Sequence, residues 1–222
     1  PSGDSWPLQA SLWRQKASLL VPNGAGTGIS TLGLGSTASG TATARNPAST
    51  NLFTSTRRLG YVSAATAGAT AGVRHNALTF WRGNAAELGG FLFSCRFGIS
   101  DAAAVADARM LIAMSATSAA FANANPTTLL NFIGIGCDNA QTTLRIMHND
   151  GTGAATVIDL GANFPANTRN VDLFEATFYC PPNAANVFYR VERLGTAFVA
   201  EGSITTKLPA NTAFLSPQVW RN

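Results

Sequence analysis

The chain has 222 residues, of which only 12% are charged and 46% are hydrophobic, and its formal net charge is +4. This length suits one large domain with a sizeable core, and the hydrophobic content argues against disorder throughout the chain. The thirteen arginines and two lysines are spread along the sequence rather than gathered in a basic patch, which argues against nucleic-acid binding.

Membrane insertion and metal binding find no support in the sequence. Two uncharged stretches, 17–44 and 110–137, are interrupted by Gly, Ser, Thr, Pro or Asn, so neither predicts a membrane helix. The three cysteines are far apart, which argues against a disulfide framework, and no C-x-x-C indicates a zinc site. We therefore expect no metal, no cofactor, synthesis in a reducing cytoplasm, and buried free thiols at Cys95, Cys137 and Cys180.

The chain begins with a glycine-rich region. Residues 1–20 are compatible with either a strand or a short helix. Three glycines at alternate positions in residues 24–28 resemble a phosphate-binding loop, but no Lys-Ser/Thr follows, so a glycine-rich turn or strand edge is the better interpretation. We expect residues 1–50 to be an arm of first strands packed on the core or on a neighbouring subunit, and residues 51–222 to form the main domain.

From residue 91 onward, short apolar runs alternate with turn signals. In residues 91–99 the odd positions are apolar, which is typical of a strand with one buried face. Residues 132–137 predict a strand whose two glycines permit close packing, and Asn149-Asp150-Gly151 predicts a hairpin turn because Asn and Gly tolerate positive φ. Further strands are expected at residues 109–115, 143–148, 155–160, 171–180, 187–193, 197–201, 213–215 and 219–220. About ten or more short strands predict an all-β fold, an antiparallel β-sandwich or jelly roll.

Several sequence strings point to a family. Residues 144–153 read L-R-I-M-H-N-D-G-T-G, and other strings are R-G-N-A-A-E-L-G-G-F, I-G-I-G-C-D, F-Y-R-V-E-R-L, L-P-A-N-T and P-Q-V-W-R-N. Together they resemble the β-sandwich domain of tail fibre and receptor-binding proteins of bacteriophages and prophages, which is similar to concanavalin-type jelly rolls. The resemblance implies a homotrimeric virion component, assembled in the host cytoplasm with other virion proteins, that attaches to a bacterial surface glycan or protein.

The candidate binding residues are Trp81, Arg82, Arg145, His148 and Asp150. Lectin-like sites use an aromatic platform with polar groups nearby, and Trp81 with Arg82 could form one, although packing at a sheet end also explains them. An enzyme could use His148 or Asp150 as a base. A hydrogen-bonded turn accounts for these two residues better, because Asx side chains bond to their own backbone.

Nothing in the sequence matches a nucleophile, zinc-protease or nucleotide motif, so we expect no catalytic residue and no enzymatic activity. Glycoside hydrolysis needs two carboxylates at a fixed separation, and the sequence offers Asp138 with Asp150 and Glu192 with Glu201. We expect His75 at the surface or at a trimer interface. Three functions remain open, and we favour host attachment. The second is a structural role as a capsid, head-fibre or baseplate subunit without a receptor site. The third is cleavage of a glycan by a depolymerase.

Overall fold

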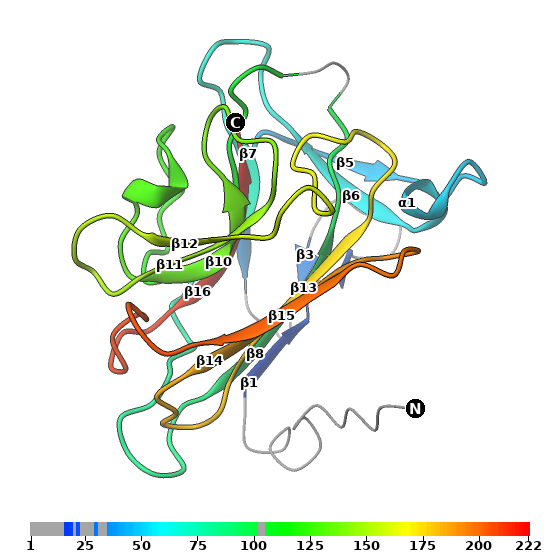
Figure 1. Ribbon diagram of the computed structural model, residues 1–222. Helices are drawn as coiled ribbons and strands as arrows, with labels where there is room; N and C mark the ends of the chain where they lie inside the picture. Colours follow the sequence, from blue (N-terminus) through cyan, green and yellow to red (C-terminus); the bar gives the residue numbers. More distant parts are fainter. Residues whose placement is uncertain (1–15, 20, 23–28, 31–34, 102–104) are drawn as a thin grey trace.

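The computed structural model describes residues 16–19, 21–22, 29–30, 35–101 and 105–222. Within them almost all regular structure is β-strand, apart from the helical turn α1 (Leu52–Ser55) and the 3-10 turn η2 (Pro126–Thr128). Two large sheets contribute to one shared hydrophobic core, as Figure 1 shows in outline. The predicted all-β sandwich with ten or more strands is confirmed.

The five-stranded sheet has the order β1-β8-β13-β14-β15. Its strands are β1 (Lys16–Leu19), β8 (Phe91–Phe97), β13 (Phe174–Cys180), β14 (Val187–Arg193) and β15 (Val199–Ile204). All neighbours are antiparallel except β1, which runs parallel to β8. The alternation in β8 places Phe91 and Phe93 in the core, while Arg96 faces outward and donates to Glu175 of β13 at 2.9 Å.

The seven-stranded sheet has the order β12-β11-β10-β9-β16-β7-β4. Its strands are β12 (Thr156–Asp159), β11 (Arg145–Asn149), β10 (Phe132–Cys137), β9 (Met110–Ser115), β16 (Ser216–Arg221), β7 (Ala71–His75) and β4 (Ser36–Ser39). A Cβ on Gly134 would lie 2.5 Å from that of Ala113 on β9, so the predicted close packing at this glycine is confirmed. β16 lies between β9 and β7 and is antiparallel to both.

Two small hairpins complete the described structure. They are β2 (Val21–Pro22) with β3 (Ile29–Ser30), and β5 (Thr41–Arg45) with β6 (Arg58–Val62), which has α1 in its connection. Figure 1 shows β5, β6 and α1 together at one side of the sandwich. Strands from the first 50 residues therefore join both large sheets, through β1 and β4. Contact of this arm with a neighbouring subunit stays a prediction, and the glycines of residues 24–28 lie outside the described residues.

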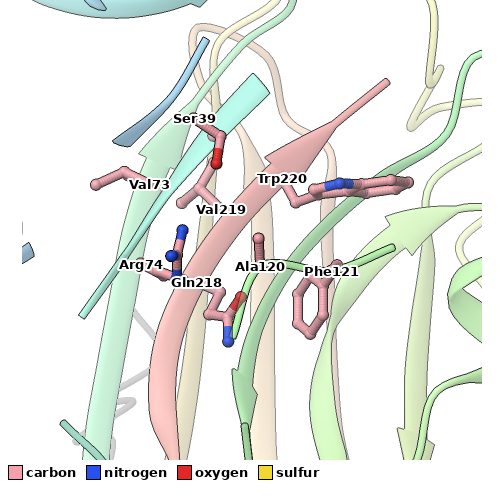
Figure 2. A pocket seen from close by; sticks show the side chains of 9 residues that line it. Ser39, Val73, Arg74, Ala120, Phe121, Gln218, Val219 and Trp220 are labelled. Carbon is pink, nitrogen blue, oxygen red and sulfur yellow. The ribbon is translucent and has the colours of Figure 1, made fainter. Parts of the chain in front are cut away.

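Both faces of the seven-stranded sheet are buried near its centre. The inner face meets the five-stranded sheet in the main core. On the outer face, segment 116–131 folds over the sheet, and Phe121 meets Trp220 edge to face with ring centroids 6.4 Å apart. Arg74 of β7 holds this segment by donating its Nε–H to the Ser118 carbonyl at 2.8 Å. Figure 2 shows Arg74, Phe121 and Trp220 around a notch of about 10 Å³, which is large enough for about one water molecule.

The turn predicted at residues 149–151 is longer than a two-residue hairpin. Asn149 ends β11 and is fully buried, while β12 begins only at Thr156. The Asn149 side chain accepts the Gly151 N–H at 2.6 Å and donates to the Gly153 carbonyl at 3.0 Å. The predicted turn is confirmed in place, and the next strand begins one residue after the expected position 155; one buried amide organises the loop between the two strands.

The expected surface or interface position of His75 is wrong. Only 1% of this residue is exposed, and neither ring nitrogen has a hydrogen-bond partner among the described residues. Burial lowers the pKa of His75, so the neutral ring is favoured at neutral pH.

Candidate functional site

Four connecting segments meet at one end of the sandwich: residues 76–90, 149–155, 181–186 and 205–215, which we call the loop end (Figure 1). The segment between β15 and β16 joins the others. Its Leu215 carbonyl accepts the Thr79 N–H at 3.0 Å, and its Asn211 carbonyl accepts the Gly83 N–H at 3.2 Å. The loop end therefore combines residues that are far apart in the sequence.

Trp81 lies at the loop end as half of an aromatic pair. Its ring stacks on Phe214 with centroids 5.3 Å apart and an interplanar angle of 23°. Trp81 is half-buried, whereas 49% of Phe214 is exposed. Leu78 and Leu88 are also exposed large apolar residues of the loop end. The pair therefore offers a rigid aromatic surface to solvent, of the kind that stacks on the apolar face of a sugar ring.

Arg82 holds three loops together. Its two terminal guanidinium nitrogens donate to the Pro209 carbonyl at 3.0 Å and to the Ala184 carbonyl at 2.8 Å. Its own carbonyl accepts the N–H groups of Gly90 at 3.1 Å and Asn183 at 2.9 Å. With both terminal nitrogens bonded to the backbone, Arg82 positions the aromatic pair beside it.

His148 is a buried part of the loop end. It lies on the inner face of β11 with 2% of its surface exposed, and its Nδ1 is 3.0 Å from the Lys207 carbonyl. Because a carbonyl can only accept, Nδ1 carries the proton. Burial lowers the pKa of His148, and this effect outweighs the Lys207 carbonyl and Asp150, which both raise it. His148 thus fixes the Lys207 backbone and does not face solvent.

Asp150 forms a polar cluster at the surface with Thr152 and Lys207. Its carboxylate accepts the Thr152 hydroxyl at 2.7 Å and lies 3.2 Å from the Lys207 ammonium. Lys207 also donates to the Thr152 hydroxyl at 2.9 Å. The Thr152 hydroxyl, aided by Lys207, lowers the pKa of Asp150 below its usual range. The cluster presents a carboxylate, an ammonium group and a hydroxyl, a set that can both accept from and donate to sugar hydroxyls.

Arg145 does not join this surface. It begins β11, at the strand end away from Asp150, and its guanidinium pairs with Asp159 at 3.0 Å. The Gly161 N–H lowers the pKa of Asp159, and the Thr143 hydroxyl and Arg145 add to this effect. The structure therefore gathers Trp81, Arg82, His148 and Asp150 at the loop end and leaves Arg145 elsewhere.

Asp138 and Asp150 are too far apart for a glycosidase pair, and Glu192 and Glu201 are both engaged by an arginine. The register of β10 and β11 places Asp138 opposite the start of β11, so it lies roughly 20 Å from Asp150 at about 3.3 Å per residue. Glycosidases need about 5–9.5 Å. Glu192 and Glu201 both pair with Arg190, the latter at 3.4 Å, so a guanidinium occupies the position where a substrate would have to lie.

The cysteines are free, as predicted. Cys137 and Cys180 are buried, and Cys95 is partly buried. Burial raises the pKa of Cys95 to about 12 and that of Cys180 to about 11, and it also raises the pKa of Cys137. In the described part of the chain, no group of three or more His, Cys, Asp or Glu side chains is arranged to hold a metal ion. The same part contains no helix with the length and apolarity of a membrane span.

The sequence did not reveal three members of the loop end: Thr152, Lys207 and Phe214. Each lies in a loop, where no periodic pattern indicates the direction of a side chain. Phe214 is 133 positions from Trp81, and only the pairing of Phe80 with Leu215 brings the two rings together. Lys207 is one of only two lysines in the chain, which is the one compositional signal that could have drawn attention to it.

Comparison with known proteins shows the fold of the chain. No protein-family model and no curated protein sequence matches it. Among solved structures, it is similar to peanut lectin, there in complex with a nine-residue peptide, with a TM-score of 0.52, 10% identity, and coverage of 88% of this chain and 86% of the lectin. A carbohydrate esterase from the Shiga toxin-encoding bacteriophage phi24B aligns with a TM-score of 0.47, 16% identity, and coverage of 84% and 81%. The chain therefore has a lectin-like β-sandwich fold.

Proposed function

We propose that the protein is a virion component that attaches a bacteriophage to its host by binding a bacterial surface glycan at the loop end. The observation that carries the proposal is that the exposed Trp81–Phe214 stack and the Asp150–Thr152–Lys207 cluster both lie at the loop end, with Phe214 and Lys207 on one connecting segment. The phage setting rests on the resemblance of residues 89–222 to tail fibre domains. A protein described as a lectin shares the fold, which supports the choice of a glycan over a protein receptor.

In the proposed complex, the apolar face of one sugar residue stacks on the aromatic pair. The hydroxyls of a neighbouring sugar residue of the same glycan donate to the Asp150 carboxylate and accept from Lys207. The loop end is organised for this task before the ligand arrives, because Arg82 and His148 fix the loop backbones that carry these groups. Preorganisation lowers the entropic cost of binding. The interaction is proposed to be reversible and non-catalytic.

A homotrimer would make weak sites effective. One sugar on an open surface binds weakly, but three linked sites raise the effective concentration for the second and third contacts. The low charge content of the chain, 12%, suits a subunit partly covered by other copies. Light scattering of the purified protein measures the trimer, and antibody labelling of intact phage particles measures its proposed place in the virion.

The attachment proposal is tested with fluorescently labelled protein on a panel of bacterial strains and their purified surface polysaccharides. A double variant, Trp81→Ala with Phe214→Ala, is expected to lose binding while keeping its unfolding temperature within a few degrees. Phe198→Ala is the matched control, since Phe198 is also exposed (38%) but lies in the turn between β14 and β15, at the other end of the sandwich.

Equal binding by the double variant and the control would remove the loop end as the receptor site. Absence of binding to every strain, together with labelling inside the particle, would favour the structural capsid or baseplate alternative. Release of reducing sugar from a bound polysaccharide would instead establish the depolymerase alternative.

A further inference from the structure

A second feature lies at the opposite end of the sandwich and is independent of the attachment proposal. A cavity of about 550 Å³ lies between the second half of β8, the strands β7 and β16, and the β5–β6 hairpin. Among the described residues, β1 pairs with residues 91–94 of β8, and residues 94–97 of the same strand line the cavity. Cavities of 300–1,000 Å³ are the usual size of small-molecule sites.

The cavity has an apolar floor and a basic rim. Phe53, Phe97, Met110, Leu173 and Val219 contribute to the floor. Among the described residues, the rim carries five arginines and two carboxylates, those of Asp101 and Glu175. Glu175 is paired with Arg96 and Asp101 with Arg221, so the two carboxylates neutralise two of the arginines and leave a net positive rim.

Two of the remaining arginines, Arg45 and Arg58, face each other without a counterion. They are register partners on β5 and β6, and neither forms an ion pair among the described residues. Arg58 is held 4.5 Å over the Phe53 ring. The Arg45 side chain lies across Gly60, and its buried Nε has no hydrogen-bond partner in the described structure. Burial, and then the charge of Arg45, lower the pKa of Arg58.

This arrangement is unfavourable without an anion. Like charges that are partly removed from water repel each other, and a guanidinium nitrogen without a partner loses hydrogen-bond energy. A carboxylate, sulfonate or phosphate between the two guanidinium groups would relieve both, because the planar forks bind such oxygens in pairs. The apolar side chains of the floor would bury a hydrocarbon body.

We propose that this cavity is a binding site for a small anionic amphiphile, whose hydrocarbon body lies on the apolar floor and whose acidic head group binds Arg45 and Arg58. The site differs from the loop end in position and in ligand class. Apolar burial supplies most of the affinity, and the two arginines supply the preference for an anion.

The first test uses the wild-type chain and three ligands of equal chain length, decanoate, decanol and decyltrimethylammonium, below their micelle concentrations. Each is titrated against bound anilinonaphthalene sulfonate, a fluorescent anionic amphiphile. Decanoate is expected to displace the dye most strongly and the cation least. Equal displacement by all three, or strongest displacement by the cation, overturns the proposal.

The second test locates the site. Arg45→Gln combined with Arg58→Gln is expected to weaken decanoate binding roughly tenfold or more, since charged hydrogen bonds are lost, and to leave decanol binding within about twofold. Arg190→Gln removes a charge from the outer face of the five-stranded sheet and is the matched control. An unchanged decanoate affinity in the double variant, with a normal unfolding temperature, shows that the acid binds elsewhere and overturns the proposal.

Discussion

Replacing Arg82 tests whether this residue stabilises the loop end or contacts the ligand. In Arg82→Ala, the Pro209 and Ala184 carbonyls both lose a charged donor. A hydrogen bond to a charged group contributes about 1.5–3 kcal/mol, and the half-buried position favours the lower value. Two such bonds predict a loss of about 3 kcal/mol in the free energy of unfolding. For a chain of this size that corresponds to an unfolding temperature lower by about 9 °C.

Urea unfolding, followed by tryptophan fluorescence, measures this loss directly, and an unchanged m-value keeps the comparison valid. Arg82→Lys is expected to recover at most about half of the loss, because one ammonium group cannot reproduce the planar fork that reaches two loops. Arg190→Ala removes two partly exposed surface ion pairs and is expected to change stability by less than about 1 kcal/mol. If Arg82→Ala keeps full stability and loses only glycan binding, Arg82 contacts the ligand and the structural assignment is refuted.

Three further predictions concern the interior. The lowered pKa values of His75 and His148 mean that the unfolded chain binds protons more readily, so the free energy of unfolding falls as the pH drops below about 6.5, which urea titrations at pH 7.5 and 5.5 measure. Gly134→Ala should destabilise the fold by more than about 1 kcal/mol in thermal unfolding, because its Cβ would lie 2.5 Å from that of Ala113. The buried Cys180 thiol, with a pKa near 11, should react with a disulfide reagent at pH 8 only after unfolding.

Each of these predictions has its own check. The pH effect should shrink when His75 is replaced by Leu, and an unchanged dependence would show that other groups titrate. Gly35→Ala is the control for Gly134→Ala and should destabilise the fold less. A Cβ at Gly35 would meet only the flexible Asn76 side chain, at 3.1 Å. Rapid reaction of Cys137 or Cys180 in the native protein would contradict the assigned burial.

The sequence predicted those strands in which buried and partly exposed residues alternate along the strand itself. The alternation in residues 91–99 was sufficient because β8 has one buried face and one partly exposed face. In β9 and β10 every residue is buried, since segment 116–131 covers the outer face with Phe121. No local pattern indicates that a loop will fold back over a sheet, so this cover could not be predicted.

The candidate site was predicted in part for the same reason. Asn149 and Asp150 belong to a turn that their own side chains build, so the sequence placed them correctly. The stacking of Trp81 on Phe214 depends on the insertion of β16 beside β7, which is a long-range contact. The bonds of the Asn149 side chain to Gly151 and Gly153 become evident only in three dimensions.

The central place of β16 has a consequence for how the chain reaches its native state during synthesis. Ser216 bonds to the backbone of His75, 141 residues earlier, and β16 alone joins β7 to β9. At about 5–20 residues per second, a ribosome needs roughly 7–30 s between these two points. During that interval β7, and β9 once it has been synthesised, lack their shared neighbour and present open strand edges that can pair with other chains. The nascent protein is therefore expected to rely on holding chaperones, and slower translation of residues 116–215 should lower its soluble yield.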